Sequence, residues 1–141
     1  MAVLGAAALM LSGCGTISGL RRAAAPNVCQ DLTVSIYFQR DSAVITREGQ
    51  AVLKGAGDRT RGCVLGQVDV TGLADAVGDP DANLALSKQR ADAVRDAVVR
   101  LGFSTVNFSV GAVGEQGAVT PTGDDRPLRR RADVTFHLSR H

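Results

Sequence analysis

One acidic and one basic residue in the stretch 72–101 have the chemistry of a recognition site. Asp75 lies in a short polar turn, and Arg90 lies in the helix that we predict after this turn. A carboxylate binds an ammonium group, and a guanidinium binds a carboxylate through two parallel hydrogen bonds. The pair can therefore hold a zwitterion, which indicates a binding site rather than a centre for catalysis.

A strand before Asp75 and a helix after it should position the two charges. The alternation of residues 64–70 predicts a half-buried strand. Asp79-Pro80 is typical of an N-cap followed by Pro at the first helical position. Ligands of α/β sheets bind beyond the carboxyl ends of parallel strands, where helix N–H groups add positive charge. From about three turns into the helix, the Arg90 side chain could reach back to this loop. We expect its buried face to consist of Ala91, Val94, Val98 and Leu101.

The remaining elements follow from the same periodicities. Alternation predicts strands at 32–38, 106–110 and 132–138. Thr46 is a plausible N-cap of a helix with its apolar face at Val52, Leu53 and Ala56, ending at Gly55 and Gly57. Helical crossovers usually join parallel neighbours with one handedness. We therefore predict an α+β fold of order βαβαββ, a two-layer sandwich with both helices on one face of a four-stranded mixed sheet.

The positions around the two charges form a longer pattern, namely Asp75, Gly78, Asn83, Leu86-Ser87, Arg90-Ala91 and Val94. This pattern resembles the signature of the OmpA-like peptidoglycan-binding domain. The segments 36–53 and 127–136 resemble the first strand and helix and the closing strand of that family. The resemblance covers the chain from about Leu32 to Leu138.

The resemblance implies a ligand and a role for each site residue. In that family, the aspartate at the position of Asp75 binds the ammonium group of diaminopimelate in the peptidoglycan stem peptide. The arginine at the position of Arg90 binds its carboxylate. A supporting pocket is implied at Phe38, Asp41, Asn83, Leu86 and Arg131.

Four positions depart from the family pattern, at Gln39, Ala74, Ala82 and Arg129. Ala74 lacks the usual hydroxyl and Ala82 lacks the usual aromatic ring, which affects affinity more than the binding mode. These departures keep open a second class, an envelope protein-interaction module with weak or no cell-wall binding.

An enzyme is the third class. Asp69 and Asp75 are close in sequence and could form a carboxylate pair for glycan hydrolysis. No further acid, histidine or nucleophile converges on them, because His137 and His141 lie near the C-terminus. The sequence holds no Gly-rich phosphate loop and no Ser-His-Asp arrangement. We therefore expect a protein that is not an enzyme and that needs no cofactor or metal.

The first residues resemble an export signal. Residues 1–13 are uncharged and apolar, and they lead into Leu11-Ser12-Gly13-Cys14, which resembles the lipobox of bacterial lipoproteins. The resemblance implies a signal peptide at 1–13, a Cys14 that carries lipid such as palmitate, and a flexible tether at 14–30. The domain is expected at 31–140. Gly15 favours the outer membrane, with the domain in the periplasm. The alternative is a buried apolar segment with an incidental cysteine.

Two cysteines remain, Cys29 and Cys63, and each precedes a predicted strand. Export to an oxidising compartment favours a disulfide between them, and the alternative is two buried thiols. Without further cysteine or histidine at ligand spacing, zinc is not expected. Lys and Arg total 16 against 14 for Asp and Glu, so nucleic acid is not an expected partner. The expected partners are peptidoglycan, the membrane through Cys14, and envelope proteins.

Overall fold

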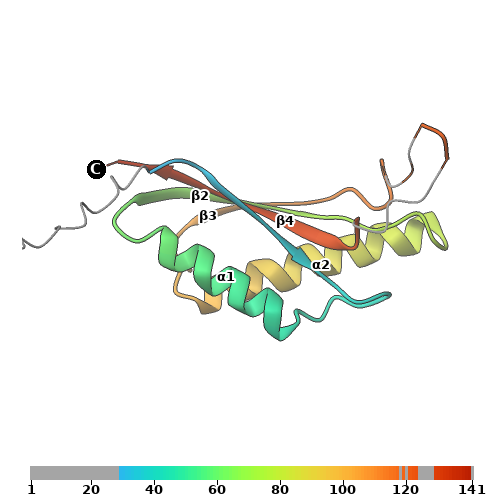
Figure 1. The fold of residues 1–141 in the computed structure, drawn as a ribbon, viewed down its shortest axis with the longest axis horizontal. Coiled ribbons are helices and arrows are strands. Elements are labelled where there is room, and N and C mark those ends of the chain that lie inside the picture. The colour runs from blue at the N-terminus through green and yellow to red at the C-terminus, as the bar shows by residue number, and fades with distance from the viewer. Residues whose placement is uncertain (1–28, 118, 120, 124–128, 141) are drawn as a thin grey trace, which may run out of the picture.

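The computed structural model describes residues 29–117, 119, 121–123 and 129–140. The expected signal peptide, Cys14 and most of the expected tether lie outside the described residues. The elements follow the predicted order, as β1 (Leu32–Tyr37), α1 (Arg47–Arg59), β2 (Val64–Gly72), α2 (Pro80–Arg100), β3 (Asn107–Ala112) and β4 (Arg131–Ser139). Both helices lie on one face of the sheet (Figure 1). The predicted two-layer α+β fold is confirmed.

The described strands form a four-stranded sheet of order β1-β4-β2-β3. β4 pairs antiparallel with both β1 and β2, and β2 pairs parallel with β3. α2 thus joins parallel neighbours, as we expected. α1 does not, because the last strand of the chain lies between β1 and β2. The consequence is that the carboxyl ends of β1 and β2 flank the beginning of β4.

The core between the two layers is mainly aliphatic. It takes inward residues of the sheet and the buried faces of both helices, including Ile36, Leu53, Val68, Val70, Ala91, Val94, Val98, Val134 and Phe136. Phe103 meets Phe136 edge to face, with ring centroids 6.1 Å apart. Val52 and Leu101, which we expected to be buried, are 41% and 42% exposed. Val52 lies next to the buried Leu53 in α1, and Leu101 is the C-cap of α2, one residue beyond its last turn.

Two local features differ from the sequence prediction. α1 continues through Gly55 and Gly57 and ends at Arg59, with Thr60 as its C-cap. Gly57 serves packing instead, because a Cβ there would lie 3.2 Å from the Phe103 ring. The second feature is a shift of register in β2 between Leu65 and Gln67. Such a bulge reverses the alternation of side chains along the strand. Leu65 therefore packs against the core, where we expected Val64 and Gly66.

The two ends of β2 have different attachments. At its start, Cys63 forms a disulfide with Cys29, with the Cα atoms 5.7 Å apart. At its end, Gly72 lies directly under α2, and a Cβ on this residue would stand 1.8 Å from the carbonyl oxygen of Ser87. The helix can approach the strand this closely only because residue 72 is a glycine.

The substitution Gly72→Ala should therefore destabilise the domain by at least about 2 kcal/mol, because backbone must move to admit the methyl group. Urea denaturation measures the loss. The matched control is Gly111→Ala on the neighbouring strand β3, where a Cβ meets nothing within 4 Å. We expect this control to change stability by no more than about 0.5 kcal/mol. Equal effects of the two variants would contradict the close approach.

Candidate functional site

Arg90 is fully buried, and its guanidinium is bound by backbone carbonyls from two separate loops. Nε donates to the carbonyl of Ser42 at 2.9 Å and Nη1 to that of Leu73 at 2.9 Å. Nη2 donates to the carbonyl of Gln39 at 3.3 Å. Three of the five N–H donors of the guanidinium thus hold the loop after β1 against the loop after β2.

The charge of Arg90 is balanced by groups around it. Its Cζ lies 5.2 Å from the centroid of the Phe38 ring, within the range of a cation–π contact. The pKa of Arg90 is lowered, first by burial and also by the positive charge of Arg130. The negative charges of Asp75 and Asp41 oppose this shift. An arginine stays protonated through such shifts, so a permanent positive charge lies beneath the loops.

Asp75 lies in the loop after β2, as we predicted, and its nearest described cation is Arg130. Arg130 Nη1 lies 3.5 Å from Asp75 Oδ2, and the two side chains are 28% and 13% exposed. Two backbone bonds fix this part of β4, because Phe38 N donates to the carbonyl of Arg130 and Leu73 N to that of Arg131, both at 2.9 Å. Asp75, Arg90 and Arg130 therefore meet where the chain leaves β1 and β2 and enters β4.

The other predicted site residues have different positions. Phe38 and Asp41 adjoin Arg90 through the ring contact and through charge. Asn83 is buried and donates to the carbonyl of Val77 at 3.2 Å and to Glu115 Oε2 at 2.9 Å. It thereby links the loop before α2 to the loop after β3. Leu86 is partly buried one helical turn before Arg90.

Arg131 does not share this position. Its Nε donates to Asp133 Oδ1 at 2.8 Å. This hydrogen bond raises the pKa of Arg131. Side chains alternate along a strand, so Arg131 and Asp133 lie on the sheet face opposite the helices. The cation beside Asp75 is Arg130, which we had not named, whereas Arg131 was expected among the residues that support the pocket. The run 129–131 signalled a cation here, but only the register of β4 decides which arginine faces the site.

The sequence analysis did not identify the groups that hold the loop after β2 against the loop after β3. Ser87 Oγ accepts from Gly114 N at 3.0 Å, and Ala74 N donates to the carbonyl of Gly114 at 2.8 Å. The free helix N–H groups that we expected near Asp75 are partly occupied, because Ala82 N donates to the N-cap Asp79 at 2.9 Å. The site is therefore preorganised by backbone contacts more than by the helix terminus.

The carboxylate pair of the enzyme alternative does not form. Asp69 Oδ2 lies 2.7 Å from His137 Nε2, and Asp31 Oδ2 lies 2.7 Å from His137 Nδ1. This Asp31–His137–Asp69 cluster lies on the sheet face opposite the helices, whereas Asp75 lies beyond the end of β2. Among the described residues, no group of three or more His, Cys, Asp or Glu could hold a metal ion.

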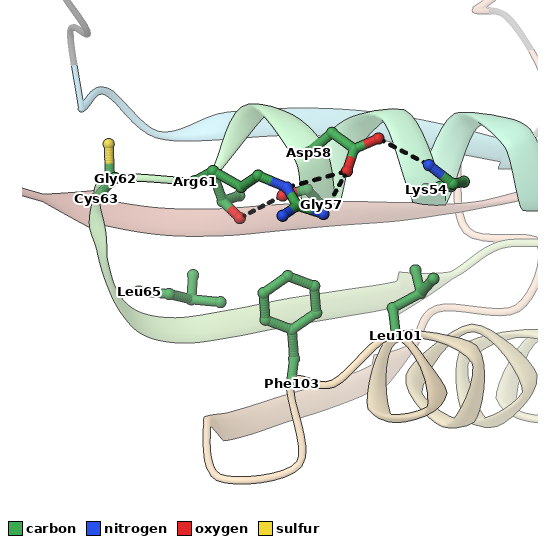
Figure 2. Close-up of a pocket in the computed structure, with 10 residues that line it drawn as sticks. Lys54, Gly57, Asp58, Arg61, Gly62, Cys63, Leu65, Leu101 and Phe103 are labelled. Carbon is green, nitrogen blue, oxygen red and sulfur yellow. Dashed lines mark hydrogen bonds and ion pairs between the residues drawn. The ribbon is translucent and has the colours of Figure 1, made fainter.

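A hollow of 410 Å³ lies at the other end of β2, beside the disulfide. Figure 2 shows Phe103 near Leu65, with Asp58 joined to both Lys54 and Arg61. These charges already satisfy one another at 3.0 Å each. The charged residues that line the hollow therefore pair with one another at the surface, whereas the Asp75 end is built around the buried Arg90.

The fold is a domain of the two-layer α+β class. Residues 37–131 match the OmpA family. The chain belongs to this family, which confirms the resemblance found in its sequence and agrees with a protein that is not an enzyme. Across the described residues, no helix has the length and apolar character needed to cross a membrane.

The relatives described below match between 48% and 84% of this chain. It is 32% identical over 123 residues to the peptidoglycan-associated lipoprotein of Mesorhizobium japonicum, covering 84% of this chain and 69% of that protein. It is 25% identical to the probable lipoprotein YiaD of Escherichia coli, covering 78% of this chain but only 51% of the relative. It spans 19% of the outer membrane protein A of Yersinia pseudotuberculosis, at 40% identity over 48% of this chain.

Solved structures share the fold. The peptidoglycan-associated lipoprotein from Burkholderia pseudomallei superimposes with a TM-score of 0.61 at 28% identity, over 72% of this chain and 88% of that one. The cell wall anchor of the T6SS from Pseudomonas aeruginosa superimposes with a TM-score of 0.56 at 25% identity, over 77% and 82%.

The burial of Arg90 predicts a structural cost of its removal. Arg90→Met should lower the free energy of unfolding by about 2–4 kcal/mol, because buried carbonyls lose their donor. The control is Arg100→Met, an exposed arginine on the same helix, which should change it by no more than about 0.5 kcal/mol. Urea denaturation compares them, and an Arg90→Met protein as stable as the control would exclude the bracing role.

The Asp31–His137–Asp69 cluster predicts a pH dependence of stability. Hydrogen bonds to Asp69 and Asp31 raise the pKa of His137 above 6.5, so its contribution is complete below that pH and is lost as pH rises through the folded value. The pKa values of Asp31 and Asp69 are lowered below 3.8, so their contribution is lost only as pH falls further. The stability difference between wild type and His137→Gln should thus be larger at about pH 5.5 than at about pH 8.5. Thermal melts at both pH values measure it, and a difference independent of pH would refute the cluster.

Proposed function

We propose that this chain binds peptidoglycan without a covalent bond and tethers the outer membrane to the cell wall. The observation that carries the proposal is that Asp75 lies near the buried positive charge of Arg90 at the carboxyl end of β2. Backbone hydrogen bonds already hold Arg90 there. Relatives named peptidoglycan-associated lipoprotein support it, because they match this chain over most of its length.

The group recognised is the zwitterionic end of diaminopimelate in the stem peptide. Asp75 accepts hydrogen bonds from its ammonium group, and the permanent charge of Arg90 favours its carboxylate. Because Arg90 is already held by backbone carbonyls, the site need not reorganise when the ligand arrives. Such preorganisation lowers the entropic cost of binding.

The membrane end of the tether is the predicted lipid on Cys14, with the described domain in the periplasm. Cys14 precedes Cys29 by a segment long enough to separate the domain from a membrane surface. The disulfide at Cys29 then fixes the point where the chain enters the domain. A shift in mass from acyl chains on Cys14, in protein isolated from membranes, tests this part.

The alternative of an envelope protein-interaction module has one observation in its favour. Ala82, where the family has an aromatic residue, is exposed on the first turn of α2 and offers no ring to a ligand. Ala74 is buried, and its N–H is used by the carbonyl of Gly114, so the missing hydroxyl there leaves the backbone contact intact. Failure of the folded wild-type chain to bind sacculi would favour this module.

A sacculus pull-down tests the proposal. Asp75→Asn should weaken binding at least about tenfold, because an amide cannot replace a carboxylate opposite an ammonium group. Free diaminopimelate should compete for the wild-type protein. The matched control is Asp81→Asn, which removes the same charge from an exposed position at the start of α2 and should bind as wild type does. Undiminished binding by Asp75→Asn would reject the assignment of the site.

A further inference from the structure

Exposed arginines lie at the end of the domain that carries the disulfide. β2 and β3 are parallel, and α1 and α2 lead into their starts, so both helices end at the same end of the sheet. Arg59 ends α1, Arg61 follows it before β2, and Arg100 ends α2. All three residues are exposed. We call the surface formed by Arg59, Arg61 and Arg100 the basic end.

The acids at this end do not neutralise its cations. Lys54 and Arg61 share one carboxylate, that of Asp58, at 3.0 Å each, and their side chains are 70% and 80% exposed. One carboxylate carries one negative charge, so a positive charge remains. Arg59 and Arg100 have no ion-pair partner among the described residues.

Two further acids near this end already have partners. Asp31 is bonded to His137 and Asp96 to Arg95, both at 2.7 Å. The basic end therefore faces solvent with an excess of positive charge. Such a charge attracts an anionic surface over a Debye length, about 10 Å at moderate salt.

Apolar side chains lie among these cations. Leu65, Leu101 and Phe103 line the hollow of 410 Å³ together with Arg61 (Figure 2). Leu101 also lines a second hollow of 220 Å³ between α1 and α2, together with Arg100. A surface that combines Lys and Arg with apolar side chains suits an anionic bilayer, because cations meet the headgroups and apolar groups enter the boundary with the acyl chains.

The chain also enters the domain at the basic end. Cys29 is bonded to Cys63, which lines the larger hollow. Residues 15–28 separate Cys29 from Cys14, the predicted site of the lipid. A segment of this length spans at most roughly 50 Å even when fully extended. A lipid on Cys14 would therefore keep the basic end near the membrane surface, whereas Asp75 lies at the other end of β2.

We propose that the basic end binds an anionic lipid bilayer, and that this contact directs the Asp75 end of the domain away from the membrane. The headgroups supply the negative charge that the surroundings of Arg59, Arg61 and Arg100 lack. Leu101 enters the boundary between headgroups and acyl chains. The contact with lipid goes beyond the proposed function, because it involves neither Asp75 nor peptidoglycan. Once the chain is anchored, this second contact becomes intramolecular, so a weak affinity suffices to populate it.

Sedimentation of vesicles with the purified full chain tests the proposal. Every protein carries Cys14→Ser so that no acyl chain contributes, and residues 1–28 are otherwise the same in all of them. The probes are vesicles of phosphatidylcholine alone and of phosphatidylcholine mixed with an equal part of phosphatidylglycerol. The chain should prefer the anionic vesicles, and its binding should weaken between about 50 mM and about 500 mM salt because of screening.

The charges of the basic end are removed together in the triple variant Arg59→Gln, Arg61→Gln and Arg100→Gln. Each cation near an anionic surface contributes about fivefold to binding, so the affinity for anionic vesicles should fall about ten- to a hundredfold. Thermal melts check that the variant folds.

The matched control neutralises three exposed cations in the half of the domain that holds Asp75, by Arg40→Gln, Arg47→Gln and Lys88→Gln. Lys88 pairs with one carboxylate as Arg61 does, so the two triple variants lose similar surface contacts. The control should bind anionic vesicles as the parent chain does.

A tryptophan reports which surface meets the bilayer. The chain contains no Trp, so Leu101→Trp introduces a single fluorophore at a position that is 42% exposed. Its emission should shift to shorter wavelength when anionic vesicles are added. Val77→Trp, at a position 47% exposed in the loop before α2, should show no shift.

The outcomes separate this proposal from the proposed function. A parent chain without preference for anionic vesicles, or equal loss of binding in the two triple variants, would overturn the proposal. The triple variant of the basic end should still bind sacculi as wild type does, because its arginines lie at the far end of β2 from Asp75. A chain that binds anionic vesicles but no sacculi would overturn the proposed function alone.

Discussion

The candidate site depends on one buried guanidinium. Arg90 enters from the middle of α2 and donates hydrogen bonds to carbonyls that follow β1 and β2. A buried cation is costly unless dipoles and opposite charges surround it, and these are supplied by the carbonyls, the Phe38 ring and the nearby carboxylates. Because the cation needs both loops, the two loops are held at a fixed separation. Asp75 follows Leu73 in the loop after β2, so the bond from Arg90 to the Leu73 carbonyl also fixes the position of Asp75.

Charge type and spacing identified Asp75 and Arg90, but burial decides what each can do. Arg90 follows Asn83 and Ser87 at helical spacing and precedes Val94, and all of these residues are buried. The periodicity of α2 thus contained the signal that Arg90 lies on the inner face. We expected the Arg90 side chain to reach back to the loop from about three turns into the helix, and a fully buried arginine is rare. No pattern in the sequence indicated that Arg130 lies beside Asp75. Which of the three consecutive arginines faces Asp75 depends on the register of β4, and this register is set by pairing with β1 and β2.

The fold was largely predictable because its periodicities are regular. The caps Thr46 and Asp79 accept hydrogen bonds from Gly49 and Ala82 as their sequence contexts predict. The failures have tertiary causes. Gly57 continues α1 because the Phe103 ring occupies the space of a side chain, and the bulge at Leu65 arises from pairing with β4. The insertion of β4 between β1 and β2 joins segments from opposite ends of the domain, which local patterns do not encode.

The same topology relates the site to the predicted anchor. β2 is bonded on both sides, to β4 and to β3, whereas β1 is an edge strand bonded to β4. The disulfide attaches the entering chain at Cys29 to Cys63, just before β2, and Asp75 lies just after β2 at its far end. Under the proposed function, a load between lipid and cell wall enters one end of β2 and leaves at the other. Antiparallel ladder bonds run perpendicular to the strands, so a load along β2 is opposed by many bonds at once. A load through β1 alone would pass only through its single ladder with β4, so the disulfide places the load on a strand that is bonded on both sides.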